Sequence, residues 1–271
     1  MDCSIIILNY KTPGLLRVSL KGLAAANLAL DYEIIVVDNA SGDTSVDMVR
    51  REFPNVKLVA SPVNGGFAAG NNLGLCAAQG EFAIIMNPDL AVFPGVIENL
   101  VATMRQRPDV GLLAPQLRNP DGTVQVSAYR FPSLSIALLR RTPFGKLPWA
   151  RRKLRSYLML DANLTAAHPV DWVLGGCMIV RRAALGSVGL LDERFFMYVE
   201  DVDWCRRFWE AGFPVIYDPS VSLVHYHQRQ SAESPGLTGV FSRLTRVHIA
   251  SWIKYFWKYR RNPIPHLPPH D

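Results

Sequence analysis

Three carboxylates, Glu200, Asp201 and Asp203, interrupt a stretch at residues 195–204 that is otherwise apolar and aromatic. Burying a carboxylate costs several kcal/mol unless it is paired, hydrogen-bonded or metal-bound, so a segment that only built a core would not contain three. Carboxylates can also act as general bases toward a substrate hydroxyl. The structural alternative is that these acids stabilise the first turn of a helix ending near Gly212. An isolated acidic cluster favours that alternative, so the choice depends on the other motifs.

A glycine-rich motif at residues 64–74, Asn-Gly-Gly-Phe-Ala-Ala-Gly-Asn-Asn-Leu-Gly, lies where a strand is expected to give way to a helix. Small residues there let backbone amides and the helix dipole approach a nucleotide diphosphate. The motif has neither Gly-Lys-Ser/Thr nor the spacing Gly-x-Gly-x-x-Gly, which argues against kinase-like and NAD-binding functions. A tight turn with close helix packing explains the glycines equally well.

Asp89, His225 and His227 are candidates for a metal or diphosphate site. Asp89 follows an apolar strand and the rigid Pro88, a position from which a carboxylate can hold a divalent ion between two phosphates. Asn-Pro-Asp is also ordinary turn chemistry. His225 and His227 end a later strand and, as alternate residues, share one face, although a single histidine at a strand end is more often structural.

The elements before residue 115 predict a doubly wound α/β unit that positions these side chains. Short β-branched runs alternate with helical stretches; the runs are residues 4–9, 33–38, 56–59 and 82–86, and the helices are residues 13–28, 44–53 and 66–79. In such a sheet the ligand site lies beyond the carboxyl ends of the strands. Polar residues collect at those ends, namely Asn9, Asp38, Asn39, Asn87 and Asp89.

The sequence is less regular after residue 115. Residues 118–170 combine turn residues, scattered prolines and a basic run, which predicts a flap or an insertion. Order resumes at residue 171, with strands expected to end near residue 181 and to cover residues 215–217 and 221–225. Residues 247–261 space their apolar and aromatic side chains as an amphipathic helix with a basic face, which can dock on the protein or on a membrane.

Length and cysteine usage indicate a globular protein of a reducing compartment. The chain has 271 residues, of which 49% are hydrophobic, enough for one large α/β domain. Its four cysteines show no paired spacing of a zinc site or a disulfide framework, which favours the cytoplasm. The first expected strand begins almost at Met1 and no run of about 18 apolar residues occurs, so we expect a protein that is neither exported nor membrane-spanning.

The net charge of +6 is unevenly distributed. Residues 140–155 contain seven basic residues and no acid, and residues 243–261 are similar. A basic surface indicates an anionic partner such as nucleic acid, phospholipid or a pyrophosphate, although solvation is the commonest explanation of a charge run. No nucleic-acid-binding module organises these residues, so we expect no nucleic-acid partner.

Together the motifs resemble glycosyltransferase family 2, in particular the rhamnosyltransferase-like branch of bacterial polysaccharide enzymes. The resemblance covers roughly residues 3–230 and implies an α/β protein with the GT-A fold, a Rossmann-like, mostly parallel central sheet flanked by helices with a C-terminal acceptor-side region. The segments that carry it, in the family's order, are Ile-Ile-Leu-Asn-Tyr (6–10), Val-Val-Asp-Asn-Ala-Ser (36–41), the glycine-rich motif (64–74), Asn-Pro-Asp (87–89), Asn-Pro-Asp-Gly-Thr (119–123), Gly-Gly (175–176) and Phe-Phe-Met-Tyr-Val-Glu-Asp-Val-Asp-Trp (195–204).

The resemblance also implies a division of the chain. Residues 1–115 would form the nucleotide-sugar-binding half, and residues 116–230 the acceptor-binding and catalytic half of the same domain. Residues 231–271 would form a basic amphipathic C-terminal helix and tail.

By the same resemblance the enzyme inverts the attacked sugar carbon, and Asp201 is its base, with Glu200 and Asp203 tuning and orienting it. Adjacent carboxylates raise one another's proton affinity, which suits a base acting near neutral pH. On the acceptor side the expected residues are Trp172, Gly176, Arg130 and Asp203.

On the donor side the resemblance assigns the base or ribose of a nucleotide sugar to Asp38, and its expected neighbours are Asn9, Asn39, Gly66 and Asn71. Asp89 matches the last acid of the family's Asp-x-Asp metal motif, and His225 is expected to complete the metal or diphosphate site. Asn87 replaces the first acid, which removes one anionic ligand of the expected Mg²⁺ or Mn²⁺.

The branch commonly transfers L-rhamnose from dTDP-rhamnose to glycan or polyprenyl-pyrophosphate-linked acceptors. We therefore expect a role in cell-surface polysaccharide synthesis, in the cytoplasm and peripherally at the inner face of the plasma membrane, where the two basic regions meet anionic lipid or the pyrophosphate. One alternative is a UDP- or GDP-sugar donor, because no residue visibly measures the 6-position of the sugar. Another is a non-catalytic nucleotide-sugar binder, which Asn87 permits and the retained Glu200, Asp201 and His225 argue against.

Overall fold

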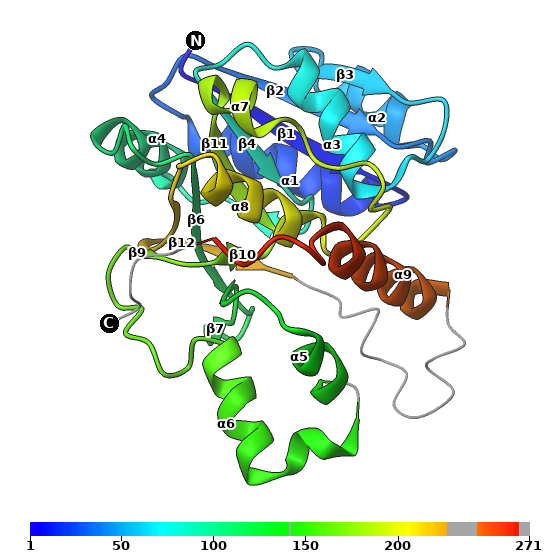
Figure 1. Ribbon diagram of the computed structural model, residues 1–271. Coiled ribbons are helices and arrows are strands. Elements are labelled where there is room, and N and C mark those ends of the chain that lie inside the picture. The colour runs from blue at the N-terminus through cyan, green and yellow to red at the C-terminus, as the bar shows by residue number, and fades with distance from the viewer. Residues whose placement is uncertain (141, 227–242, 266–271) are drawn as a thin grey trace.

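The first half of the chain builds the parallel part of a mixed sheet (Figure 1). A computed structural model describes residues 1–140, 142–226 and 243–265. Four parallel strands lie in the order β3-β2-β1-β4, and a helix follows each of the first three, which confirms the predicted doubly wound unit. These elements are β1 (Cys3–Asn9), α1 (Pro13–Ala26), β2 (Tyr32–Asp38), α2 (Ser45–Glu52), β3 (Lys57–Ala60), α3 (Gly66–Ala77) and β4 (Phe82–Met86).

Strand directions mix in the rest of the sheet, which continues β11-β6-β12-β5 beyond β4. β11 is antiparallel to both β4 and β6, whereas β12 runs parallel to β6. The two strands expected at residues 215–217 and 221–225 are one strand, whose register against β6 shifts between Asp218 and Ser222. The predicted break between two strands was therefore wrong. Pro219 lacks an amide donor, which explains the local irregularity, and the strand continues through it. The bounds are β5 (Leu90–Ala91), β6 (Leu112–Arg118), β11 (Cys177–Arg181) and β12 (Val215–His225).

Both faces of the sheet are buried, which is why the strands read as continuous apolar runs. Ile5 and Ile7 of β1 pack into the core that α1 and α4 cover. Ile6 points to the other face, where α3, α8 and α9 complete the core. The remaining helical elements on the body of the protein are α4 (Val96–Gln106), η2 (Arg182–Ala184), α7 (Leu185–Val188), α8 (Glu200–Glu210) and α9 (Arg243–Lys258).

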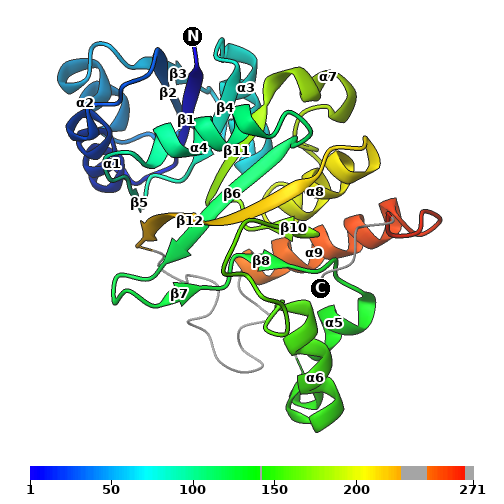
Figure 2. The same ribbon diagram turned by 90° about the vertical axis from the view of Figure 1, so that its left-hand side faces the viewer.

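The segment expected to be a flap or insertion is partly built into the sheets. β7 pairs with β6 and β9 pairs with β12, while β8 and β10 form a separate two-stranded sheet. Between β8 and β9 the chain forms a helical lobe, residues 133–140 and 142–160, which projects away from the central sheet (Figures 1 and 2). The bounds are β7 (Val124–Gln125), β8 (Ala128–Tyr129), α5 (Leu134–Leu139), η1 (Pro143–Lys146), α6 (Pro148–Tyr157), β9 (His168–Pro169) and β10 (Trp172–Val173).

The predicted amphipathic helix near the C-terminus, α9, packs on the protein. Its Tyr255 is buried in the core beside α8, and the Ser251 hydroxyl donates a hydrogen bond to the carbonyl of Met197. The Arg206 guanidinium of α8 lies over the ring of Tyr259. Part of the apolar face of α9 therefore docks on the protein, whereas Ile253 and Trp257 of the same helix are exposed. Among the helices of the described residues, none combines the length and apolar character that a membrane span requires.

Candidate active site

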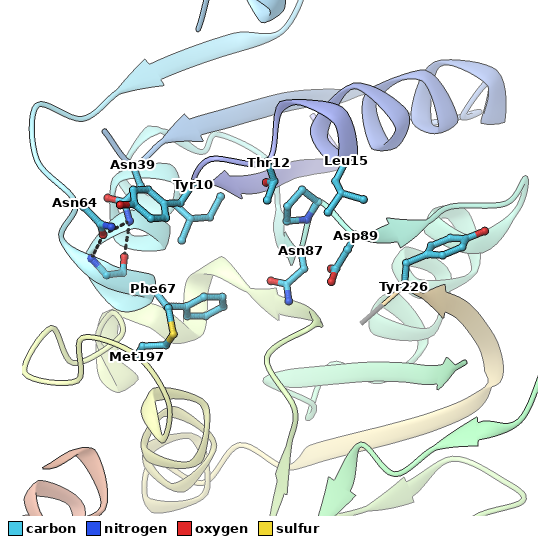
Figure 3. Close-up of a pocket in the computed structure, with 13 residues that line it drawn as sticks. Tyr10, Thr12, Leu15, Asn39, Asn64, Phe67, Asn87, Asp89, Met197 and Tyr226 are labelled. Carbon is cyan, nitrogen blue, oxygen red and sulfur yellow. Dashed lines mark hydrogen bonds between the residues drawn. The ribbon is translucent and has the colours of Figure 1, made fainter. Parts of the chain in front are cut away.

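A cavity of about 540 Å³ lies at the carboxyl ends of the parallel strands (Figure 3). This is the position at which open α/β sheets bind ligands. Figure 3 shows Tyr10, Asn39 and Asn64 grouped at one end of the cavity, with Asn87 and Asp89 near its centre. We call it the donor cavity. Four of the predicted donor-side residues line it, namely Asn39, Gly66, Asn87 and Asp89.

Asn9 and Asp38 support the donor cavity from a buried network and do not line it. The register of β1 and β2 sets them opposite each other, and Nδ2 of Asn9 donates to Oδ1 of Asp38 over 2.9 Å. The amide of Ser41 donates to the other carboxylate oxygen over 3.0 Å. The network fixes the loops after β1 and β2, one of which carries Asn39. The expected contact of Asp38 with a base or ribose stays a prediction.

The glycine-rich motif shapes the donor cavity through close backbone packing. Gly66 has a φ of +85°, and a Cβ there would overlap the carbonyl oxygen of Phe196, so only glycine fits. The amide of Gly66 donates to Asn64, and Nδ2 of Asn39 donates to the Gly66 carbonyl. The amide of Phe67 donates to the carbonyl of Phe196 over 2.7 Å. These amides at the start of α3 are already hydrogen-bonded, which favours the tight-packing explanation of the motif over a contact between them and phosphate.

A second cavity, of about 350 Å³, adjoins the donor cavity because Phe67, Asn87 and Met197 line both. We call it the acceptor cavity. Glu200 and Asp201, the first residues of α8, line it, so the acidic segment meets the donor-side motifs at this point. The other predicted site residues along its wall are Trp172, Gly176 and His225.

Two backbone amides hold the carboxylate of Asp201. The amide of Gly175 donates to Oδ2 over 3.1 Å, and the amide of Val202 donates to Oδ1 over 2.8 Å. Asp201 is only 8% exposed, and burial raises its pKa to about 6 against the opposing effect of the two amides. A carboxylate with this pKa is ionised at neutral pH and takes up a proton more readily than an ordinary aspartate.

Glu200, the neighbour of Asp201, has a different electrostatic setting. It is buried, and its Oε2 has no hydrogen-bond partner among the described residues. Burial first, and then the charge of Asp201, raise the pKa of Glu200 well above its ordinary range. The arrangement favours a neutral Glu200 beside an ionised Asp201, so that one group can donate a hydrogen bond while the other accepts a proton.

The backbone that delivers these carboxylates is strained. Tyr198 and Val199 have φ values of 68° and 74°, although neither is glycine. The left-handed region is unfavourable for a β-branched residue such as Val199, and outliers of this kind cluster at functional sites. The two residues turn the chain into α8 immediately before Glu200, which fixes where the acidic pair enters the acceptor cavity.

Asp89 and His225 meet near the junction of the cavities. Nε2 of His225 lies 3.3 Å from Oδ1 of Asp89, and its Nδ1 lies 2.9 Å from Oε1 of Gln125. Within the described ranges, no three His, Cys, Asp or Glu side chains gather around one possible ion position. A divalent ion here would have a carboxylate and an imidazole from the protein, and further ligands from diphosphate oxygens and water, as is common for Mg²⁺. His227 lies outside the described residues.

Trp172 forms an aromatic wall of the acceptor cavity. Its ring stacks on Tyr129 at a centroid separation of 4.2 Å, and its Nε1 donates to the carbonyl of Arg130 over 2.9 Å. Gly176 adjoins the donor side, because its carbonyl accepts a hydrogen bond from the amide of Asn87, which lines both cavities. Trp172 is only 5% exposed and belongs to the core, so a small part of its surface is open to the cavity that Asp201 also lines.

Asp203 lines neither cavity, in contrast to its expected acceptor-side role. Residues two apart on a helix point about 200° from each other, so Asp203 faces away from the cavity that Asp201 lines. It is fully buried, and it accepts hydrogen bonds from the Tyr259 hydroxyl, the Lys258 ammonium and the Arg207 guanidinium. Asp203 therefore fastens α9 to α8.

Arg130 and Asn71 also line neither cavity. The Arg130 guanidinium donates to the Ser156 hydroxyl and to Asp161, so it ties α6 to the base of the helical lobe. Asn71 is fully buried inside α3 and donates to the carbonyl of Phe67. Their expected contacts with substrate have no support in these positions.

Several lining residues of the acceptor cavity were absent from the predicted site, among them Tyr129, Arg140, His248 and Trp252. His248 and Trp252 come from α9, and the ring of His248 lies 4.5 Å from that of Tyr198. The amphipathic pattern of α9 was visible in the sequence, but its docking partner was not. Arg140 begins the basic run, whose charge gave no indication that one member reaches the cavity.

Comparison with known proteins identifies the family. The sequence profile described as "Glycosyl transferase family 2" matches residues 4–188. A relative from Mycobacterium tuberculosis, "N-acetylglucosaminyl-diphospho-decaprenol L-rhamnosyltransferase", is 32% identical over 246 residues, which are 85% of this chain and 77% of the relative. "Rhamnosyltransferase WbbL" from Escherichia coli K12 is 22% identical, over 84% of this chain and 83% of the relative.

Solved structures share the fold. Mannosyltransferase PcManGT from Pyrobaculum calidifontis, solved with GDP-Man and Mn²⁺, has a TM-score of 0.60 and 20% identity, over 99% of this chain and 66% of that one. TarS of S. aureus has a TM-score of 0.57 and 16% identity, over 84% of this chain and 37% of that one. This chain therefore spans only part of each solved chain, and at these identities the likeness concerns the fold. With a family profile that matches well over half of its length, the chain belongs to glycosyltransferase family 2 and is a glycosyltransferase with the GT-A fold.

Proposed function

We propose that this glycosyltransferase moves L-rhamnose from dTDP-rhamnose, with inversion, to a glycan or a polyprenyl-diphosphate-linked glycan in cell-surface polysaccharide synthesis. The observation that carries the proposal is the 32% identity, over 85% of this chain, to a relative named as a rhamnosyltransferase acting on N-acetylglucosaminyl-diphospho-decaprenol. The adjoining donor and acceptor cavities support it, because a transferase must hold both substrates side by side.

Asp201 is the proposed catalytic base. Its carboxylate accepts the proton of an acceptor hydroxyl while that oxygen bonds to the anomeric carbon of the donor. The bond from that carbon to the diphosphate oxygen breaks, and the nucleoside diphosphate leaves with the electron pair. A pKa of about 6 supports this role, because the group is ionised at neutral pH yet more basic than an ordinary aspartate.

Glu200 is proposed to position a substrate hydroxyl. A neutral carboxyl group whose Oε2 has no partner in the described chain can donate one hydrogen bond into the acceptor cavity. Trp172 and Gly176 belong to the adjoining wall, so a sugar ring held against that wall would present a hydroxyl to Asp201. Trp252 of α9 is a further proposed contact for this ring.

Asp89 and His225 are the proposed ligands of a divalent cation, Mg²⁺ or Mn²⁺. The 3.3 Å contact between them supports this assignment, since both side chains can turn toward one ion. Such an ion supplies positive charge opposite the departing diphosphate. Asn87 keeps a neutral oxygen between the two cavities, where the family's first acid would add a negative charge.

To identify the donor, a panel of nucleotide sugars is incubated with the protein and Mg²⁺, Mn²⁺ or EDTA, and release of the nucleoside diphosphate is measured. We expect metal-dependent turnover of dTDP-rhamnose with an N-acetylglucosaminyl-diphospho-polyprenol acceptor, at the cytoplasmic face of the membrane in the cell. Turnover of UDP-GlcNAc or GDP-mannose in place of dTDP-rhamnose would discard the rhamnosyl assignment and keep the family. Asp89→Ala is the matched variant, and undiminished turnover in it would refute the proposed metal site.

A further inference from the structure

The helical lobe exposes an unusual number of large apolar side chains. Leu138 is 65% exposed, Phe144 is 64% exposed and Trp149 is 60% exposed. A soluble surface rarely gathers such residues in one short segment without a partner. The full set in this segment is Leu134, Leu138, Phe144, Leu147, Trp149 and Leu160.

A separate set of apolar residues forms the inner side of the lobe. Ile136 and Tyr157 are buried in the core that the lobe shares with the protein body, and Leu139 is also buried. The Arg130 guanidinium also anchors α6 through Ser156. The outer apolar side chains are between 41% and 65% exposed, and none of them belongs to the buried core.

The same lobe is strongly basic. Residues 122–160 contain no Asp or Glu, and Arg151, Arg152, Lys153 and Arg155 are exposed along α6. Lys146 is exposed in the preceding turn, close in sequence to Phe144 and Trp149. Interleaved cationic and aromatic side chains on an exposed helical segment are typical of segments that lie in the interface of an anionic membrane.

We propose that the helical lobe docks on the surface of a bilayer that contains anionic phospholipid. Phe144 and Trp149 would enter the interface, and the basic residues of α6 would contact the lipid head groups. Positive charge without an acid complements this partner, and exposed aromatic side chains favour a bilayer over nucleic acid, whose binding is dominated by phosphate contacts. The lobe projects away from the sheet in Figures 1 and 2, so a flat surface can reach it.

Docking there would place the acceptor cavity beside the membrane. Arg140, at the end of α5, lines that cavity together with Asp201. An acceptor carried on a membrane lipid would then meet the base without leaving the bilayer surface. This consequence rests on the proposed function, whereas membrane binding by the lobe rests on its own exposed residues.

The test is co-sedimentation of the full chain with vesicles of phosphatidylglycerol and phosphatidylcholine in equal parts, and with pure phosphatidylcholine, at about 0.1 M salt. We expect binding to the anionic vesicles and at least about tenfold weaker binding to the neutral ones. The variants are R151E/R152E/K153E and F144A/W149A, each of which should lower the partition coefficient at least about tenfold. Turnover of soluble nucleotide sugar should be unchanged in both, because none of these residues lines a cavity described above.

Matched controls come from the opposite half of the chain. K21E/R50E/R51E reverses three exposed charges there, and V63A/F93A removes two exposed apolar side chains; both should bind the vesicles like the original chain. Absence of binding to anionic vesicles, or an equal loss in the control variants, would overturn the proposal. If the lobe residues were needed for binding to duplex DNA and no vesicle binding occurred, the partner of the lobe would be nucleic acid and not a membrane. Vesicle binding is measured without donor, so its failure is distinct from failure of the proposed rhamnosyl transfer.

Discussion

Replacing Asp201 by Asn is expected to move the difference in stability in favour of the variant as the pH rises. The folded protein holds the proton of Asp201 at a pKa of about 6, above the ordinary value of 3.8. A carboxyl group with a raised pKa binds more protons in the folded state, so stability is lost as the pH rises from about 4 through about 6. The side chain of asparagine cannot ionise, and the variant escapes this loss.

The expected size follows from the shift of about 2 units. One unit corresponds to about 1.4 kcal/mol, so the ionised Asp201 lowers the free energy of unfolding by about 3 kcal/mol at pH 8. About 2 kcal/mol of this develops between pH 4.5 and pH 8. In the variant, the NH₂ group of Asn lies against the backbone N–H of either Gly175 or Val202, so that this N–H loses its acceptor. The loss costs about 1–3 kcal/mol and does not depend on pH. That constant cost cancels in the change of the difference with pH, which reports the removed charge of Asp201 together with its effect on the pKa of Glu200.

The assay is urea unfolding of the original chain and of Asp201→Asn at pH 4.5 and pH 8. We expect the difference in unfolding free energy to move in favour of the variant by about 2 kcal/mol between the two conditions. Asp47→Asn, at an exposed position of α2, is the control for replacing a carboxylate by an amide on the surface. A difference that stays constant with pH would refute the claim that burial raises the pKa of Asp201.

Three further predictions follow from named contacts. Lys258→Met should lower the free energy of unfolding by about 3 kcal/mol in urea titrations, because it removes a charged partner of the fully buried Asp203. The control, Lys254→Met, loses only a hydrogen bond to a backbone carbonyl. Equal losses in the two variants would contradict the role of Asp203 in fastening α9. Gly66→Ala should lower the free energy of unfolding by about 2 kcal/mol or more and weaken nucleotide binding measured by calorimetry. The control, Gly14→Ala, has open space around its Cβ and should leave the stability unchanged or raise it. A stable Gly66→Ala protein that binds nucleotide normally would contradict the claim that only glycine fits there. The pKa of the proposed base predicts that kcat/KM rises with pH to a plateau above about 6, and a profile flat between pH 5 and pH 8 would count against it.

Local patterns made the donor half of the fold predictable. The runs of β1 and β2 are apolar on both sides because helices cover both faces of the sheet, and this pattern is present in the sequence. The same logic set Asn39, Asn87 and Asp89 at the carboxyl ends of strands, where the donor cavity lies. The sequence could not show that the side chain of Asp38 hydrogen-bonds to Asn9 and does not line the donor cavity, because the cavity-lining residues also follow the ends of strands.

The acceptor half was less predictable because its contacts join distant segments. Asp203 stands two residues from Asp201, yet two of its partners, Lys258 at the end of α9 and Tyr259 just beyond it, lie more than 50 residues away. The acceptor cavity likewise takes Trp252 and His248 from α9. An amphipathic pattern shows that a helix has an apolar face and does not show what that face packs against. The strain at Val199 is also invisible in sequence, since nothing in the residue types before Glu200 demands a left-handed backbone.

The most direct test of the central claim separates turnover from nucleotide binding in Asp201→Asn. Nucleoside diphosphate release is followed with the donor and acceptor pair that supports turnover, and dTDP affinity is measured by calorimetry on the same preparations. If Asp201 is the base, turnover falls by about a thousandfold while the dissociation constant for dTDP stays within about twofold. Retained turnover, whether or not dTDP affinity is lost, would contradict the assignment of Asp201 as the catalytic base.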